Sequence, residues 1–172
     1  NAHELRARVR SLLRIKRYTD DLDSAESVIV SLALTIEARD RCTEGHCERL
    51  AHYATMLGRH IGLGEDEVAV LARGGFLHDI GKVGVPDAIL LKPGKLTNAE
   101  FSVIKRHPVL GAQMLDHPSL TDVREWVSEP HEQPDVPGYP RGLADEAIPL
   151  EARIIAVADA YEAMATSLSD RS

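Results

Sequence analysis

The sequence predicts an all-α protein, and three observations support this fold class. Hydrophobic residues make up 44% of the 172 residues, but aromatic residues only 4%, so the core must be mainly aliphatic. Such a composition suits packed helices better than strands rich in β-branched and aromatic residues. Hydrophobic residues also recur at spacings of three and four, and no segment alternates like a strand. At this length we expect one domain with one core.

The first segment is predicted to be a basic helix with a narrow apolar stripe. The stripe consists of Leu5, Val9 and Leu12. Residues 1–17 carry six Lys/Arg against Glu4 alone, a local charge of +5, which leaves −12 on the rest of a chain whose total is −7. We therefore separate residues 1–22, a linker or signalling helix, from a domain over residues 23–172.

Residues 23–39 form the first predicted core helix, because their hydrophobic residues follow an amphipathic pattern up to a polar break. The next helix starts at Thr43 or Glu44 and ends near Gly62. On this helix, His46 shares a face with apolar residues spaced by three and four. His46 is therefore expected to point inward from the first turn.

The third core helix opens after Gly64 with three acidic residues, which suit the positive end of the helix dipole. Its apolar face extends to His78, which Asp79 follows directly. Gly74-Gly75 in its middle lowers the helix propensity. This pair makes sense where another helix or a ligand approaches the backbone closely.

Loops and shorter helices complete the prediction. They are an ordered loop over residues 81–96 with at most a turn or two of helix, a helix from a capping box at 97–100 to Pro108, short helices near 111–115 and 121–129, and a stiff loop over 130–142. The last helix runs from Leu150 to about Ser167 and contains Asp159. Its middle is apolar on nearly every side, so this helix is expected to be central.

The acidic charge and the two cysteines limit the class of protein. A net charge of −7 argues against a protein that coats nucleic acid, because attraction to polyphosphate needs the opposite sign. Cys42 and Cys47 are too few for a disulfide framework, and no segment is predicted to be a signal peptide or to span a bilayer. We expect a cytoplasmic protein that binds neither DNA nor membranes. Because it starts at Asn1 without Met, we expect an excised fragment.

The pair His78-Asp79 is the strongest functional signal, because a carboxylate within an apolar run is rarely buried without a partner or a metal. Other residues of this kind lie at the edges or inner faces of core segments: His46, His107, His131 and Asp159. Imidazoles and carboxylates are ligands of divalent transition metals. A single inward histidine is more often a hydrogen-bonded core residue, whereas this whole set indicates a scattered metal site.

We expect Asp79 to bridge two metals. The first site would be completed by His46, His78 and Asp159, and the second would be formed mostly by His107 and His131. A water between two cations is a hydroxide at neutral pH and can attack phosphorus in line with a leaving oxygen. Cys42 and Cys47 flank His46 and are an alternative pair of soft ligands, but small buried residues explain them better.

Several motifs occur in order between residues 25 and 165. They are His46, His78-Asp79-Ile80-Gly81-Lys82, Lys92-Pro93-Gly94-Lys95-Leu96-Thr97, His107-Pro108 with Gly111, Gly138-Tyr139-Pro140 with Gly142-Leu143, and Asp159. In these motifs the chain resembles the HD superfamily of metal-dependent phosphohydrolases and, more specifically, the HD-GYP domains. The resemblance implies an HD-superfamily helical bundle with a long ordered loop after the HD helix. It also implies hydrolysis of cyclic di-GMP with two or three metals, commonly iron or manganese.

The resemblance implies a role for each matching residue. The implied metal ligands are His46, His78, Asp79, His107, His131 and Asp159. Lys82 would act with Asp79 in catalysis, as a phosphate contact or by helping the leaving oxygen depart; alternatively it pairs with a surface carboxylate. Tyr139 would line the substrate mouth or, with its Gly138-Tyr139-Pro140 loop, bind a diguanylate cyclase domain; alternatively it only anchors the loop.

The N-terminal helix is similar to the last helix of response-regulator receiver domains. This similarity implies a two-component response regulator whose receiver domain is missing here, with residues 1–22 as an interdomain or homodimer helix.

The chain departs from the family pattern at four places. Pro130 replaces the first of two adjacent histidines, so the second metal site loses a ligand and should bind its metal more weakly. Cys42 stands where members with a third metal carry Glu, so no ordinary third site is expected. Val136 replaces a loop glycine. Beyond Asp159, only Arg171 substitutes for the family's phosphate-binding Arg-Pro-Tyr-Arg stretch.

Three functions therefore stay open. The first is a phosphodiesterase that linearises cyclic di-GMP. The second is a degenerate HD-GYP module that binds metal or nucleotide and signals through protein partners without turnover. The third is an HD phosphohydrolase for another nucleotide.

Overall fold

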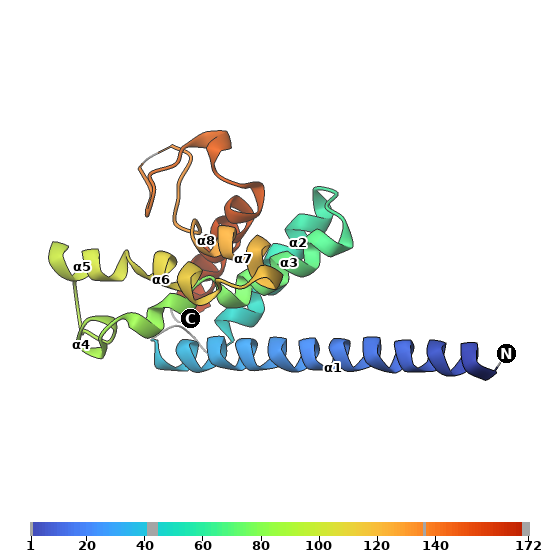
Figure 1. Ribbon diagram of the computed structural model, residues 1–172. Coiled ribbons are helices and arrows are strands. Elements are labelled where there is room, and N and C mark those ends of the chain that lie inside the picture. The colour runs from blue at the N-terminus through green and yellow to red at the C-terminus, as the bar shows by residue number, and fades with distance from the viewer. Residues whose placement is uncertain (1, 41–44, 136, 170–172) are drawn as a thin grey trace. The chain divides into compact units, whose positions relative to one another are not determined.

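The computed structural model describes residues 2–40, 45–135 and 137–169, and all regular elements within these ranges are helical (Figure 1). The predicted all-α class is confirmed. An isolated β-bridge joins His131 to Tyr139. No helix in the described ranges has the length and apolar character that crossing a membrane requires. The chain divides into two compact units, Asn1–Leu32 and Ala33–Ser172, which are described separately.

The first unit consists of most of helix α1 (Ala2–Arg39), whose last turns belong to the second unit. The helix runs without a break from the predicted basic first segment into the helix predicted at 23–39, since neither glycine nor proline separates them. Leu12 of the predicted apolar stripe is 66% exposed. The role of residues 1–22 as a linker or signalling helix stays a prediction.

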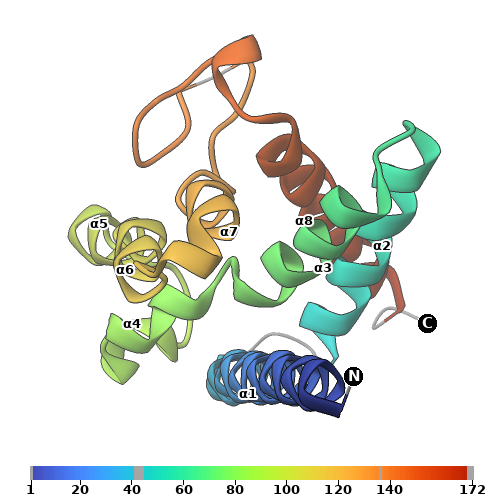
Figure 2. The same cartoon turned by 45° about the vertical axis from the view of Figure 1, so that its right-hand side comes forward.

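Four helices form the core of the second unit. They are α2 (His46–His60), α3 (Glu65–Leu77), α7 (Thr121–Val127) and α8 (Leu150–Ser169). Helix α2 packs against α3 and α8, and α3 also contacts α7, as Figure 2 shows. Leu50, Leu71 and Ile155 are fully buried in the common core. Burial of each such side chain contributes about 1.5–3 kcal/mol relative to an exposed one.

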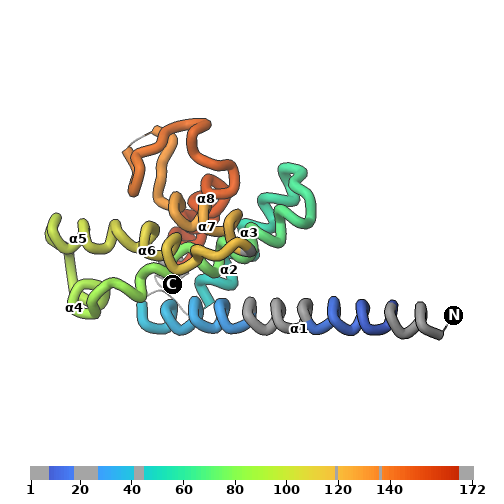
Figure 3. Tube along the Cα trace, viewed as in Figure 1, coloured from blue at the N-terminus to red at the C-terminus, as the bar shows by residue number. Residues whose placement is uncertain are grey.

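The smaller elements surround this core. They are η1 (Ile80–Gly84), α4 (Asp87–Leu90), α5 (Asn98–Ile104), α6 (His107–Met114), η2 (Pro118–Leu120) and η3 (Asp145–Ala147). The expected loop after the HD helix, with only short helical turns, is confirmed by η1 and α4. The predicted capping box is also present, since Thr97 and Glu100 exchange hydrogen bonds at the start of α5. After α7 a long loop leads back to α8, which can be followed in Figure 3.

The structure refines two details of the sequence prediction. Helix α3 ends at Leu77 with His78 as its C-cap, and Asp79 lies beyond the helix, with φ −105°. Shortly afterwards Gly81 lies so close to His107 and Gly111 that a side chain would overlap the α6 backbone. Helix α8 belongs to the core through Ile155, while Val157 on its other side is 58% exposed.

The Gly74-Gly75 pair allows two helices to approach α3 closely, as predicted. A Cβ atom at Gly75 would lie 2.8 Å from the Cα atom of Ala51 in α2. A Cβ atom at Gly74 would lie 2.7 Å from Cδ1 of Ile155 in α8. The first contact involves backbone and the second the end of a flexible side chain.

We expect Gly75→Ala to destabilise the protein more than its neighbour Gly74→Ala. The methyl group at 75 can be accommodated only if α2 moves, which should cost about 1–3 kcal/mol. The methyl group at 74 needs only a different Ile155 rotamer, and the higher helix propensity of alanine offsets up to about 1 kcal/mol. Urea denaturation of the metal-free variants measures both changes. Equal losses would contradict this account of the α2 contact.

Candidate metal centre

The first group of potential ligands consists of His46, His78 and Asp79. His46 is the first residue of α2, and the other two follow the end of α3. One ligand atom from each residue lies within 4.8 Å of the others. His78 Nε2 is 3.2 Å from Asp79 Oδ2. Both histidines are buried. The structure thus brings together three of the four residues predicted for the first site.

The second group consists of Asp79, His107 and His131, and its ligand atoms also lie within 4.8 Å of one another. His107 Nε2 is 3.1 Å from Asp79 Oδ1, the carboxylate oxygen that does not face His78. His131 Nε2 is 3.1 Å from His107 Nε2. Asp79 therefore belongs to both groups and presents a different oxygen to each, which is the arrangement of a bridging ligand.

Hydrogen bonds fix the orientation of three of these imidazoles. Nδ1 of His46 lies 2.7 Å from Glu162 Oε2, Nδ1 of His78 lies 2.9 Å from the Gly75 carbonyl oxygen, and Nδ1 of His107 lies 2.8 Å from that of Ile104. Carboxylate and carbonyl oxygens only accept, so each Nδ1 donates. In the neutral rings, Nε2 then has a free electron pair directed into the site, as in histidines that bind metals.

The Asp79 carboxylate, whose side chain is 17% exposed, fits a cation. Its buried Oδ1 atom lies 3.1 Å from His107 Nε2, and it accepts no hydrogen bond there when Nδ1 of His107 carries the ring proton. Burial lowers the pKa of His78, but the Asp79 carboxylate outweighs this effect and raises that pKa to about 9. The two groups therefore hold a proton or another cation between them. Burial also lowers the pKa of His131 to about 3, so its imidazole stays neutral and able to bind a metal.

Helix α8 places two carboxylates beside His46. Asp159 Oδ1 lies 3.6 Å from His46 Nε2, at the margin of that group. Glu162, one turn further along the same helix, is 3% exposed and accepts hydrogen bonds from His46, Arg49 and Thr166. Burial raises the pKa of Glu162, but these donors outweigh it and lower the pKa. Sequence reasoning missed Glu162, although its spacing of three from Asp159 was a usable signal.

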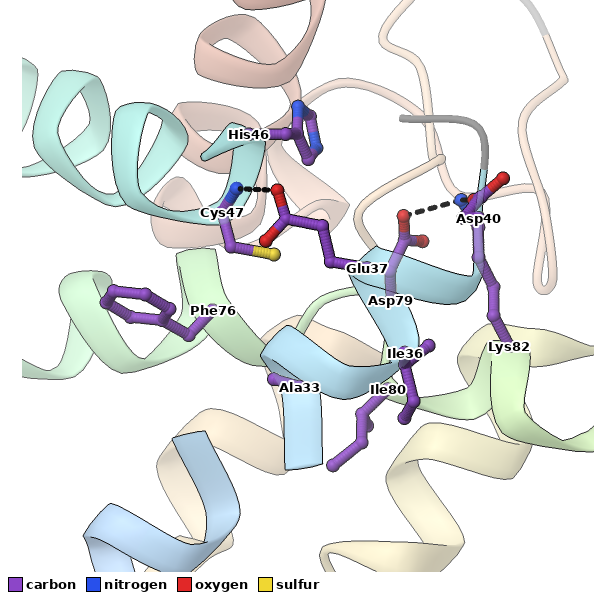
Figure 4. A pocket seen from close by; sticks show the side chains of 10 residues that line it. All are labelled: Ala33, Ile36, Glu37, Asp40, His46, Cys47, Phe76, Asp79, Ile80 and Lys82. Carbon is purple, nitrogen blue, oxygen red and sulfur yellow. Dashed lines mark hydrogen bonds and ion pairs between the residues drawn. The ribbon is translucent and has the colours of Figure 1, made fainter. Parts of the chain in front are cut away.

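Lys82 lies between two carboxylates, as Figure 4 shows. Its Nζ atom is 2.7 Å from Asp79 Oδ2 and 2.6 Å from Asp40 Oδ2. Burial lowers the pKa of Lys82, but both carboxylates outweigh burial and raise it, so the side chain is an ammonium ion. Asp40 was read only as part of a polar break. Its neighbour Arg39 donates to the Val85 carbonyl oxygen at 2.7 Å and so fixes the end of α1 to the segment after η1.

The predicted substrate residue Tyr139 lies against the second group. Its ring stacks on His131, with 4.8 Å between the ring centroids, and its backbone N–H donates to the His131 carbonyl oxygen. Burial raises the pKa of Tyr139 to about 12, so the phenol stays protonated. Glu132, only 2% exposed, accepts hydrogen bonds from three successive backbone N–H groups, those of residues 141–143. The role of Glu132 in holding this loop was not predicted.

The remaining predicted residues have different outcomes. Arg171, Cys42 and the expected helix start at Thr43 or Glu44 lie outside the described residues. Cys47 is buried and belongs to neither group of ligands in the described part of the chain. Pro130 is buried beside His131, where it offers no donor atom to a metal.

Comparisons with known proteins agree with this geometry. An HD domain family model matches residues 31–172. The cyclic di-GMP phosphodiesterase response regulator RpfG of Xanthomonas campestris pv. campestris is 38% identical over 94% of this chain and 48% of its own length. A cyclic di-GMP phosphodiesterase of Thermotoga maritima is 39% identical, over 86% of this chain and 41% of the relative.

A third relative carries the name of another substrate. The 3'3'-cGAMP-specific phosphodiesterase 2 of Vibrio cholerae is 34% identical over 90% of this chain and 30% of its own length. The chain thus spans about half or less of the length of these relatives. The family match, the motif order and the two ligand groups that share Asp79 show that this chain belongs to the HD domain family, as a domain of the HD-GYP type.

Proposed function

We propose that this domain hydrolyses a phosphodiester bond of cyclic di-GMP at a site for two divalent metals. The observation that carries the proposal is the position of Asp79, whose two oxygens face two different groups of histidines. Such a bridging carboxylate is what a two-metal phosphodiesterase site needs. The names of the relatives from Xanthomonas and Thermotoga support cyclic di-GMP as the substrate.

The residues divide into two ligand sets. One consists of His46, His78, Asp79 and Asp159, and the other of Asp79, His107 and His131. Nitrogen and oxygen donors of this kind suit iron and manganese. When bound, two such ions would acidify a water molecule and neutralise charge on the reacting phosphate.

The protein contributes orientation and charge to this reaction. The Nδ1 hydrogen bonds hold the His78 and His107 rings so that Nε2 faces Asp79. Lys82 keeps its ammonium group between Asp40 and Asp79, so it supplies a fixed positive charge beside the bridging carboxylate. This setting supports a phosphate contact more than the release of a proton to the leaving oxygen. Tyr139 supports the ring of His131 from one side.

A module that binds metal without turnover is the second candidate. Pro130 favours it, because the second set is left with three protein ligands. Hydrolysis of a different nucleotide is the third candidate. The relative named as 3'3'-cGAMP-specific supports testing 3'3'-cGAMP as that substrate. The contact with a diguanylate cyclase domain, the receiver domain, the homodimer and the cytoplasmic location stay predictions.

Metal loading and turnover decide between these candidates. We expect protein reconstituted anaerobically with Mn²⁺ or Fe²⁺ to hold two ions and to convert cyclic di-GMP to the linear dinucleotide, with 3'3'-cGAMP tested in parallel. Asp79→Asn should lower the rate by more than about 100-fold, because loss even of a residue that only orients a metal ligand costs about 10–100-fold. Asp116→Asn, at an exposed carboxylate paired with Arg124, is the control. One ion and no product in the unaltered protein would exclude the enzyme.

Pro130→His should increase occupancy of the second metal site and any phosphodiesterase activity. The new imidazole would add a fourth protein ligand beside His131. Metal analysis after dialysis against limiting Mn²⁺ measures the occupancy. Pro118→His, at an exposed proline away from the proposed ligands, controls for the mere addition of a histidine. The same occupancy in both variants would mean that residue 130 does not face the second metal.

Glu162→Gln should weaken metal binding at the first site by about 10–100-fold, as loss of a carboxylate behind a ligand histidine does in other metal sites. Titration calorimetry with Mn²⁺ measures this change. Thr166→Val is the matched control, because it removes one donor to Glu162 and leaves the His46 contact intact. An affinity unchanged by Glu162→Gln would show that His46 does not depend on this carboxylate.

A further inference from the structure

A cavity of about 330 Å³ lies beside the metal centre, between α8 and the segment that follows α7. Two of the proposed metal ligands, His131 and Asp159, line it. Pro130 and Val157 belong to its walls, and Val157 is 58% exposed, so solvent reaches this face. The volume is at the lower end of the roughly 300–1,000 Å³ typical of small-molecule sites. A ligand in this cavity would therefore touch the metal centre.

Arg153, in the first turn of α8, brings a positive charge to the same cavity. Its Nε atom is buried and donates to no acceptor in the described ranges. Glu132, which also lines the cavity, already accepts hydrogen bonds from the backbone of residues 141–143. A guanidinium group has five N–H donors and is always charged. In the described ranges Arg153 forms no ion pair with a carboxylate, so its positive charge is available to an anionic ligand in the cavity.

On the Lys82 side of the metal centre, the cavity is much smaller and the cationic side chain is already paired with carboxylates. The cavity there measures only about 10 Å³, which is space for about one water molecule (Figure 4). Lys82 itself is held at 2.6–2.7 Å by Asp40 and Asp79. On the α8 side, by contrast, a larger cavity is lined by Arg153, a cation without an ion-pair partner in the described ranges.

We propose that Arg153 binds a phosphate group of the substrate, and that the cyclic dinucleotide reaches the metals through the cavity beside α8. This inference rests on the proposed function for the identity of the substrate. The planar guanidinium fork matches two oxygens of a phosphodiester, and a phosphate held there lies beside His131 and Asp159. Arg153 thus supplies the cationic phosphate contact on the open face.

Two titrations test the assignment. Inorganic phosphate is titrated into Mn²⁺-loaded protein by calorimetry, and KM and kcat are measured with cyclic di-GMP. Arg153→Gln should weaken phosphate binding and raise KM by about 10- to 100-fold, as expected for loss of a charge-assisted hydrogen bond. The value of kcat and the Mn²⁺ content should change little. The phosphate affinity and KM of Arg153→Lys should lie between those of Arg153→Gln and those of the unaltered protein. Arg124→Gln, which removes an exposed arginine paired with Asp116, should change nothing.

Val157→Glu tests the same cavity without altering Arg153. The new carboxylate would lie one turn from Arg153 on the exposed side of α8, where it should pair with the guanidinium and repel phosphate. The matched control is Val109→Glu, at an exposed valine of α6. If Arg153→Gln does not fold, the comparison of phosphate binding in Val157→Glu and Val109→Glu decides whether the cavity binds phosphate.

The two proposals fail in different ways. Phosphate affinity within twofold of the unaltered protein in Arg153→Gln, or in Val157→Glu, would overturn the role of Arg153 even if the enzyme turns over. Absence of turnover in the unaltered protein, with phosphate binding that still depends on Arg153, would overturn the proposed reaction and support the anion site.

Discussion

Partial burial of the Asp79 carboxylate, whose side chain is 17% exposed, is the constraint on which the rest of this structure depends. A carboxylate removed from water costs several kcal/mol unless positive charge or hydrogen-bond donors surround it. Here His78, His107 and Lys82 approach it at 2.7–3.2 Å. The end of α3 and the start of α6 must therefore meet at this point. They can do so because Gly81 lies against the α6 backbone in a space that no side chain could share.

Two buried carboxylates, Glu162 and Glu132, orient the parts of the candidate site around Asp79. Glu162 fixes the His46 ring and joins α2 to α8. Glu132 holds the backbone of residues 141–143 and thereby the loop that returns Tyr139 to the ring of His131. Neither residue touches Asp79 in the contacts described, yet each holds one wall of the centre. An imidazole whose far nitrogen is fixed in this way is a stronger and better oriented ligand.

Periodicity and motif spacing were sufficient to predict most of the helices and several of the residues that the structure brings together around Asp79, because these signals lie within short segments. The contacts that sequence reasoning missed join distant segments. The close approach of Gly81 to the backbone of His107 and Gly111 in α6 is one such contact. Asp40 and Lys82 are 42 residues apart, and Asp40 reads as an ordinary polar residue at a helix end. Arg153 likewise gives no signal before the cavity beside α8 is known.

In the proposed reaction, bound metals would supply most of the positive charge that the substrate needs. Asp79 and Asp159 bring two negative charges to the proposed ligand sets, and Asp40 offsets the charge of Lys82. Without metals, the raised pKa of His78 keeps a proton beside Asp79, which offsets one of these carboxylates. Little net positive charge is then left for a cyclic dinucleotide with two phosphate charges. Divalent ions would add it, so binding of the dinucleotide should depend on metal loading, with Arg153 selecting the face from which the phosphate approaches.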